Sequence, residues 1–223
     1  MASDAVDQRP TRPLLTLGRV HQVRVQVGYR AGPDGPVHQQ FLLDLPVPET
    51  DSARDPDALG EARLLAVLEP VLHAGGEAPR HYSLHTHRWH TSWGASPGAV
   101  EIGLLVTAGT PSAAVSDAWL AGVTRAFRDL MDLVGRPEPA PTPREAALLR
   151  ARHSVATTSG LDPDALSPSA EEHHAGDNSW TVALRAWAGE AYDVVVGLVD
   201  GYAGSVRVVH RSGIEVSDSV GAE

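Results

Sequence analysis

Apolar and polar residues alternate along two neighbouring segments near the start of the chain. Residues 23–29 and residues 37–45 both place an apolar side chain at nearly every second position. A period of two is typical of a strand with one buried face. The residues between them, 31–36 (AGPDGP), are turn formers. The two segments therefore predict a β-hairpin.

Two later segments carry apolar residues at helical spacing. The first helix is predicted to start at Asp55-Pro56 and to end at Gly75-Gly76, with a kink or an early end at Pro70. The second begins at Thr110-Pro111, and its apolar face comprises Val115, Trp119, Val123, Phe127, Leu130 and Val134. Between the helices, residues 80–93 predict a strand. Residues 100–106 alternate as in a strand but could equally form a short helix capped by Ser96-Pro97.

A proline-rich segment divides the chain. Residues 136–143 (RPEPAPTP) favour extended polyproline conformation and predict an interdomain linker. After it, Thr142 and Glu145 match a capping box, so a helix is expected to start there and to end at Gly160. Three alternating segments then predict an antiparallel meander at residues 180–186, 192–198 and 206–208, with residues 166–174 as a further edge strand.

These segments predict an α+β protein of two small domains, each an antiparallel sheet packed by one or two helices. The expected organisation is a disordered lead-in (1–13), an N-terminal domain (14–135), a linker (136–143), a C-terminal domain (144–211) and an acidic tail (212–223).

Composition narrows the classes of function. The chain has 223 residues, a net charge of -10 and no cysteine, so it has no disulfide, thiolate zinc site or cysteine nucleophile. All 18 basic residues are arginines, and they are scattered rather than clustered, which argues against nucleic-acid binding. No apolar stretch approaches the ~20 residues of a membrane span, and residues 1–10 lack the apolar segment of an export signal. We therefore expect a cytoplasmic protein without a membrane partner.

Four histidines lie within ten residues: His81, His85, His87 and His90. On a strand, His81, His85 and His87 would share one face, where two imidazoles can bind one zinc ion. The segment HTHRWH has the histidine spacing of the zinc motif in metallo-β-lactamase-like hydrolases, but Trp89 stands at that motif's aspartate. A zinc-binding protein or metal-dependent hydrolase is therefore the alternative. The preferred interpretation is a polar strand with no cofactor, because histidine spacing alone is permissive.

The chain offers little else for catalysis. Residues 171–174 (EEHH) combine carboxylates and imidazoles, but their neighbours are typical of a solvated edge or loop. No serine lies in a Gly-x-Ser-x-Gly turn, and no glycine-rich phosphate loop precedes a helix. The sequence therefore favours a protein that is not an enzyme, and we assign no catalytic residue.

Trp89 and Trp93 lie four residues apart, just before the small residues 94–98, and exposed tryptophans often anchor protein interfaces. The segment SWGAS at 92–96, the proline-rich linker, SGLD at 159–162 and the Trp180…Tyr192…Gly201 meander together resemble a group of uncharacterised two-domain actinobacterial proteins that occur near conflict and signalling genes. The resemblance implies a non-enzymatic interaction or regulatory module of a bacterial multi-protein system such as a defence system. Its partner would be another protein or a second copy of itself.

Overall fold

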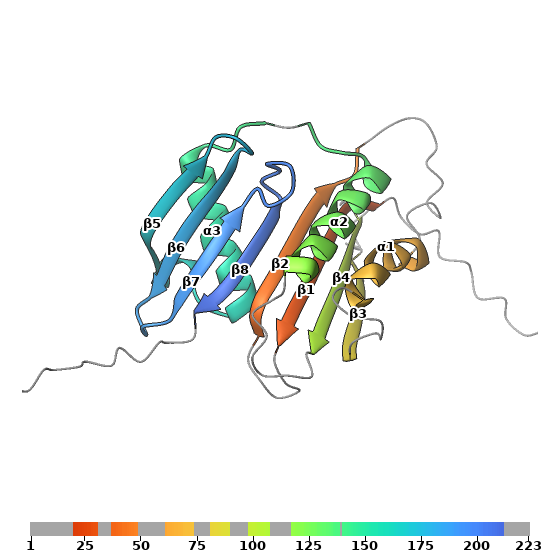
Figure 1. Ribbon diagram of the computed structural model, residues 1–223, viewed down its shortest axis with the longest axis horizontal. Helices are drawn as coiled ribbons and strands as arrows, with labels where there is room; N and C mark the ends of the chain where they lie inside the picture. The colour runs from red at the N-terminus through yellow and green to blue at the C-terminus, as the bar shows by residue number, and fades with distance from the viewer. Residues whose placement is uncertain are drawn as a thin grey trace, which may run out of the picture.

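The computed structural model describes residues 20–30, 37–48, 61–73, 81–89, 98–107, 117–138 and 140–211. They form an α+β fold with one eight-stranded mixed sheet (Figure 1), which confirms the predicted class. The strands are β1 (Val20–Arg30), β2 (Val37–Pro46), β3 (His81–Trp89), β4 (Gly98–Thr107), β5 (Leu166–His174), β6 (Ser179–Ala186), β7 (Ala191–Val196) and β8 (Ser205–Arg211). The helices are α1 (Glu61–His73), α2 (Asp117–Val134) and α3 (Arg144–Ser159), followed by a 3-10 helix at Pro163–Ala165.

The order of strands across the sheet is β3-β4-β1-β2-β8-β7-β6-β5. Neighbouring strands are antiparallel except β1 and β4, which are parallel. The prediction of a purely antiparallel N-terminal sheet is therefore wrong for this pair. The ambiguous residues 100–106 belong to strand β4, whose apolar positions pair with those of β1, as Ile102 does with Val25. This shared buried face explains why the segment alternates with a period of two.

Two hydrophobic cores lie on opposite faces of the sheet. In the N-terminal core, alternate residues of β1, β2 and β4 pack against α1 and α2, and in the C-terminal core β6, β7 and β8 pack against α3. Figure 1 shows α1 and α2 in front of one half of the sheet and α3 behind the other. Each fully buried aliphatic side chain contributes ~1.5–3 kcal/mol. The described helices therefore cover each half of the sheet on one face only.

The two halves are joined by backbone pairing and by a shared core. Residues 39–43 of β2 pair with residues 205–209 of β8, so the sheet continues across the predicted domain boundary. Val199, in the loop between β7 and β8, is fully buried in the N-terminal core. The hydroxyl of Tyr202 in the same loop donates to the carbonyl oxygen of Asp44 at 2.6 Å, and its burial raises the pKa of Tyr202 to about 12. The division into two domains is thus not confirmed.

The predicted linker also contacts the C-terminal half. Asn178 Nδ2 donates to the carbonyl oxygen of Ala140 at 3.2 Å, and Trp180 Nε1 donates to that of Thr142 at 2.9 Å. The described residues between Val134 and Arg144 form neither helix nor strand, as expected of a proline-rich segment.

The helix ends confirm some predictions and correct others. Gly160 ends α3 in the left-handed conformation, with φ 73°, as predicted. The prediction of a capping box at Thr142 and Glu145 is wrong. Pro143 is the N-cap of α3, and no side-chain hydrogen bond caps this end of the helix. Proline lacks an N–H and fits where helical N–H groups have no partner. Pro70 lies inside α1, which continues to His73. The predicted starts at 55–56 and 110–111 fall outside the described residues.

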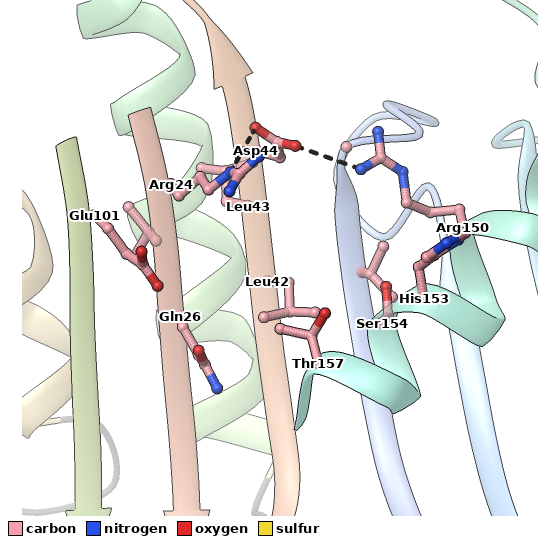
Figure 2. Close-up of a pocket in the computed structure, with 13 residues that line it drawn as sticks. Arg24, Gln26, Leu42, Leu43, Asp44, Glu101, Arg150, His153, Ser154 and Thr157 are labelled. Carbon is pink, nitrogen blue, oxygen red and sulfur yellow. Dashed lines mark hydrogen bonds and ion pairs between the residues drawn. The ribbon is translucent and has the colours of Figure 1, made fainter. Parts of the chain in front are cut away.

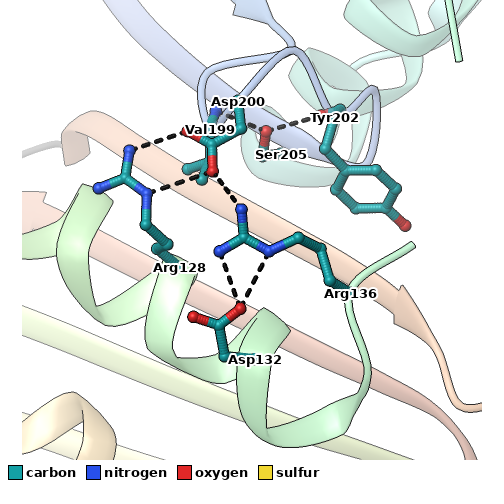
Figure 3. A network of polar contacts seen from close by, with 7 residues as sticks. All are labelled: Arg128, Asp132, Arg136, Val199, Asp200, Tyr202 and Ser205. Carbon is teal, nitrogen blue, oxygen red and sulfur yellow. Dashed lines mark hydrogen bonds and ion pairs between the residues drawn. The ribbon is translucent and has the colours of Figure 1, made fainter. Parts of the chain in front are cut away.

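An ion-pair network connects α2 to the loop between β7 and β8 (Figure 3). Arg128 donates to both carboxylate oxygens of Asp200, at 3.2 and 3.0 Å, and Arg136 donates to Asp200 at 2.8 Å and to Asp132 at 2.9 Å. The hydrogen bond from Arg128 is the main cause that lowers the pKa of Asp200, with the charge of Arg136 adding to it. The network holds the loop that carries Val199 against α2.

We expect Asp200→Asn to be less stable than the wild type at neutral pH and to lose that difference in acid. A carboxylate whose pKa is lower in the folded than in the unfolded state stabilises the fold. This contribution is complete above the ordinary aspartate pKa of ~3.9 and disappears as the pH falls through the pKa of the folded state. Urea unfolding of both proteins from neutral pH down to about pH 3 measures the difference. Asp129→Asn, at an exposed position of α2, is the matched control and should show a smaller change.

Candidate functional site

Strand β3 forms one edge of the described sheet and keeps an unbroken antiparallel register with β4. Its nine residues include no proline and no acidic residue, and Arg88 near its end is its one arginine. The opposite edge, β5, contains Pro168, a register shift before Ala170, and Glu171 and Glu172. Proline, irregular register and charge are the features by which proteins protect edge strands. Within the described chain, β3 is therefore the edge that is open to another strand.

An apolar groove flanks β3 on the α1 side. Tyr82 and Leu84 project to this side and are 51% and 38% exposed. The groove has a volume of about 640 Å³, and its apolar lining from α1 includes Leu65, Leu68 and Leu72. Tyr82 and Leu84, which line it from β3, are two residues apart, the spacing of side chains on one face of an extended segment.

The opposite face of this half of the sheet carries a row of charged and polar side chains. His87, Glu101, Arg24 and Asp44 lie side by side across β3, β4, β1 and β2. Asp44 pairs with Arg24 and with Arg150 on α3 (Figure 2). Its carboxylate lies 3.8 Å from Arg24 Nε and 3.4 Å from Arg150 Nη1. The row thus continues to α3 with charges of alternating sign, and each carboxylate lies next to a basic side chain.

A hollow of about 420 Å³ adjoins this row and extends to β3. His85, Gly103 and Gln26 lie opposite one another across three strands, and Gln26 Nε2 donates to Gln40 Oε1 at 2.7 Å. A methyl group at Gly103 would lie 3.8 Å from the carbonyl oxygen of His85, which is an ordinary contact. Packing therefore does not require glycine here, and a glycine inside a strand often marks a place where another group approaches the sheet.

A second hollow on the same face, of about 260 Å³, lies beside α3 (Figure 2). Arg150, His153 and Thr157 of α3 line one side of it, and Leu42 and Asp44 of β2 line the other. Both hollows are lined by Gln26 and Glu101, so they are neighbouring parts of one uncovered surface. Charges of both signs line this surface, from Arg24, Asp44, Glu101 and Arg150.

The histidines predicted as metal ligands are only partly placed. His81, His85 and His87 are exposed on β3, and their alternation puts them on one face of the strand, as predicted. That face is opposite α1. His90 lies outside the described residues. Over the part of the chain with assigned structure, no three His, Asp or Glu side chains are arranged to hold a metal. Zinc binding stays a prediction without support from this geometry.

Trp89 and Trp93 give no structural test of the predicted interaction surface. Trp89 ends β3, but its side chain is not among those described, and Trp93 is outside the described residues. Among the described residues, four large apolar side chains are exposed that sequence reasoning did not identify as exposed: Tyr82 and Leu84 on β3, Leu149 on α3, and Trp187, which is 85% exposed in the turn between β6 and β7. The alternation of Tyr82 and Leu84 with histidines was the available signal, but it was interpreted only through the histidines.

No protein-family model, no curated protein and no solved structure matches this chain. The resemblance to actinobacterial two-domain proteins therefore remains a prediction. None of the helices that the structure describes could cross a membrane, since none is both long and apolar enough.

Proposed function

We propose that this protein is a non-enzymatic interaction module that binds an extended segment of a partner protein along β3. The observation that carries the proposal is the open edge of β3 with Tyr82 and Leu84 exposed beside an apolar groove. The free N–H and C=O groups of an edge strand pair with another extended backbone, and alternate side chains then give specificity. The proposed role is that of a cytoplasmic accessory component of a bacterial multi-protein assembly.

The two faces of β3 define the kind of segment that fits. On the α1 side, the groove between α1 and β3 accepts apolar side chains. On the other side, the neighbours include the polar side chains of His85, His87 and Glu101 together with the apolar Leu105. Because successive residues of a strand point to opposite faces, a fitting segment alternates apolar and polar residues. The partner is thus an extended segment with a period of two rather than an amphipathic helix.

Selection of short displayed peptides on the immobilised full chain tests this proposal. We expect the selected peptides to alternate apolar and polar residues, and Tyr82→Glu to weaken their binding at least about tenfold, because a carboxylate would enter the apolar groove. Leu149→Glu is the matched control, since Leu149 is 57% exposed on α3, away from β3. Melting temperatures of both variants verify that they are folded.

Two outcomes would contradict the proposal. One is a selection whose peptides bind Tyr82→Glu and Leu149→Glu equally well. The other is a wild-type protein that dimerises in sedimentation experiments while Tyr82→Glu stays monomeric, because β3 would then pair with a second copy rather than with a different protein.

A further inference from the structure

We infer that residues 140–143 form a second interaction surface, which fits a groove lined with aromatic side chains on a partner protein. This inference goes beyond the proposed function, since the surface lies outside β3. Its basis is the proline-rich segment between α2 and α3, which Figure 1 shows running from α2 in front of the sheet to α3 behind it.

The covalent structure of this segment restricts its conformation. Proline occupies every second position from 137 to 143, so each residue from 136 to 142 either is a proline or precedes one. A proline ring fixes φ at about -65°, and the residue before a proline is restricted to extended conformations. Pro143, with φ -61° and ψ 149°, has the polyproline II conformation. Because the segment is restricted before any partner binds, little conformational entropy is lost on binding.

The fold holds residues 140–143 with their proline rings outward. Hydrogen bonds from the C-terminal half hold the carbonyl groups of Ala140 and Thr142, and Thr142 is only 7% exposed. Pro141 and Pro143, on either side of Thr142, are exposed. A polyproline II helix has three residues per turn, so the two neighbours of an inward residue point away from the surface that it contacts. The two rings therefore lie on the accessible side of an anchored segment.

The usual use of a proline-rich linker does not explain this arrangement. Such a linker acts as a semi-rigid spacer that keeps two domains apart. Here β2 pairs with β8, so the two halves are already fixed side by side in one sheet. Exposed polyproline II segments are instead the ligands of grooves lined with aromatic side chains, which use their low conformational entropy.

The charges around the segment show which interaction would dominate. Residues 140–143 carry no charge. On one flank Arg136 pairs with Asp132 and Asp200, and on the other Arg144 pairs with Glu171. Since the flanking arginines already have carboxylate partners, binding is expected to depend on apolar packing of the proline rings and to change little with salt.

A panel of isolated SH3 and WW domains, whose grooves are lined with aromatic side chains, tests the inference against the full chain. Biolayer interferometry at low and high salt measures the affinities. We expect at least one domain to bind the wild type, and Pro141→Ala to weaken that binding at least about fivefold, because the variant lacks a ring and a backbone restriction. Pro168→Ala is the matched control, since Pro168 is exposed on β5.

Several results would overturn the inference. They are the absence of binding by every domain up to about 1 mM, equal weakening by Pro141→Ala and Pro168→Ala, or binding that disappears at high salt. A lower free energy of unfolding for Pro141→Ala with unchanged binding would overturn it as well, because the proline would then only stabilise the linker.

One further variant separates this inference from the proposed function. Tyr82→Glu should bind the selected domain as tightly as the wild type, because Tyr82 lies on β3. Loss of binding in this variant would place the contact at β3 and would contradict a surface at residues 140–143. The peptide selection on β3 decides the proposed function independently of the domain panel.

Discussion

Trp119→Ala should lower the free energy of unfolding by about 3–5 kcal/mol, the usual cost of removing a fully buried tryptophan. Trp119 is 1% exposed in α2, and its ring lies 5.4 Å from that of Tyr29 on β1 and 5.3 Å from that of Phe41 on β2. The three rings connect the helix to the central strands of the sheet. The cavity left by the indole cannot close without moving these strands, so the loss is expected to be near the top of the range for single substitutions.

Urea unfolding followed by circular dichroism measures this loss. Trp187→Ala is the matched control, because the same substitution at an exposed turn should change the free energy of unfolding by no more than about 0.5 kcal/mol. A loss below about 1 kcal/mol for Trp119→Ala would show that α2 does not pack on the sheet as described.

We expect Val199→Asp to destabilise the protein by at least about 3 kcal/mol and to do so in both halves of the chain. Val199 belongs to the loop between β7 and β8, yet it is fully buried in the N-terminal core. An aspartate there would be a buried charge without a partner, and such substitutions cause some of the largest losses in the free energy of unfolding. Because the loop joins the two halves, the cost should not be confined to the half in which Val199 lies in the sequence.

Hydrogen exchange resolved along the chain distinguishes this result from that of independent domains. Val195→Asp is the matched control, since Val195 on β7 is half-buried and lies on the face of the C-terminal half that no described helix covers. Joint loss of protection in β1, β4, β6 and β7 would indicate one cooperative unit. Loss limited to the N-terminal half would instead support the two-domain division that the linker predicted.

Much of the fold followed from patterns that depend only on neighbouring residues. The alternation in residues 23–29 and 37–45 predicted β1 and β2, and the spacing of Trp119, Val123 and Phe127 predicted the buried face of α2. Gly160 ended α3 where expected because the left-handed conformation at a helix end favours glycine over other residues. Such preferences are local, so they can be identified without knowledge of the tertiary structure.

The candidate site could be predicted only in part. The histidine-rich segment was correctly assigned to a strand, and His81, His85 and His87 to one of its faces. Tyr82 and Leu84 were overlooked because an apolar residue in a strand is usually buried, and only its position at the edge of the sheet leaves it exposed. The row from His87 to Asp44 draws on four strands, and no spacing in the sequence links its members.

By itself, the sequence determined where most strands and helices lie, which of their faces are apolar, and that neither cysteine chemistry nor a recognisable catalytic motif is present. The tertiary structure decided that β4 pairs in parallel with β1, that β2 pairs with β8 across the proline-rich boundary, and that β3 is left at an edge. The physical reason is that strands pair through backbone N–H and C=O groups, which all strands share. Side-chain alternation specifies the buried face of a strand but not its neighbour, and the neighbour determines which surface remains open to a partner.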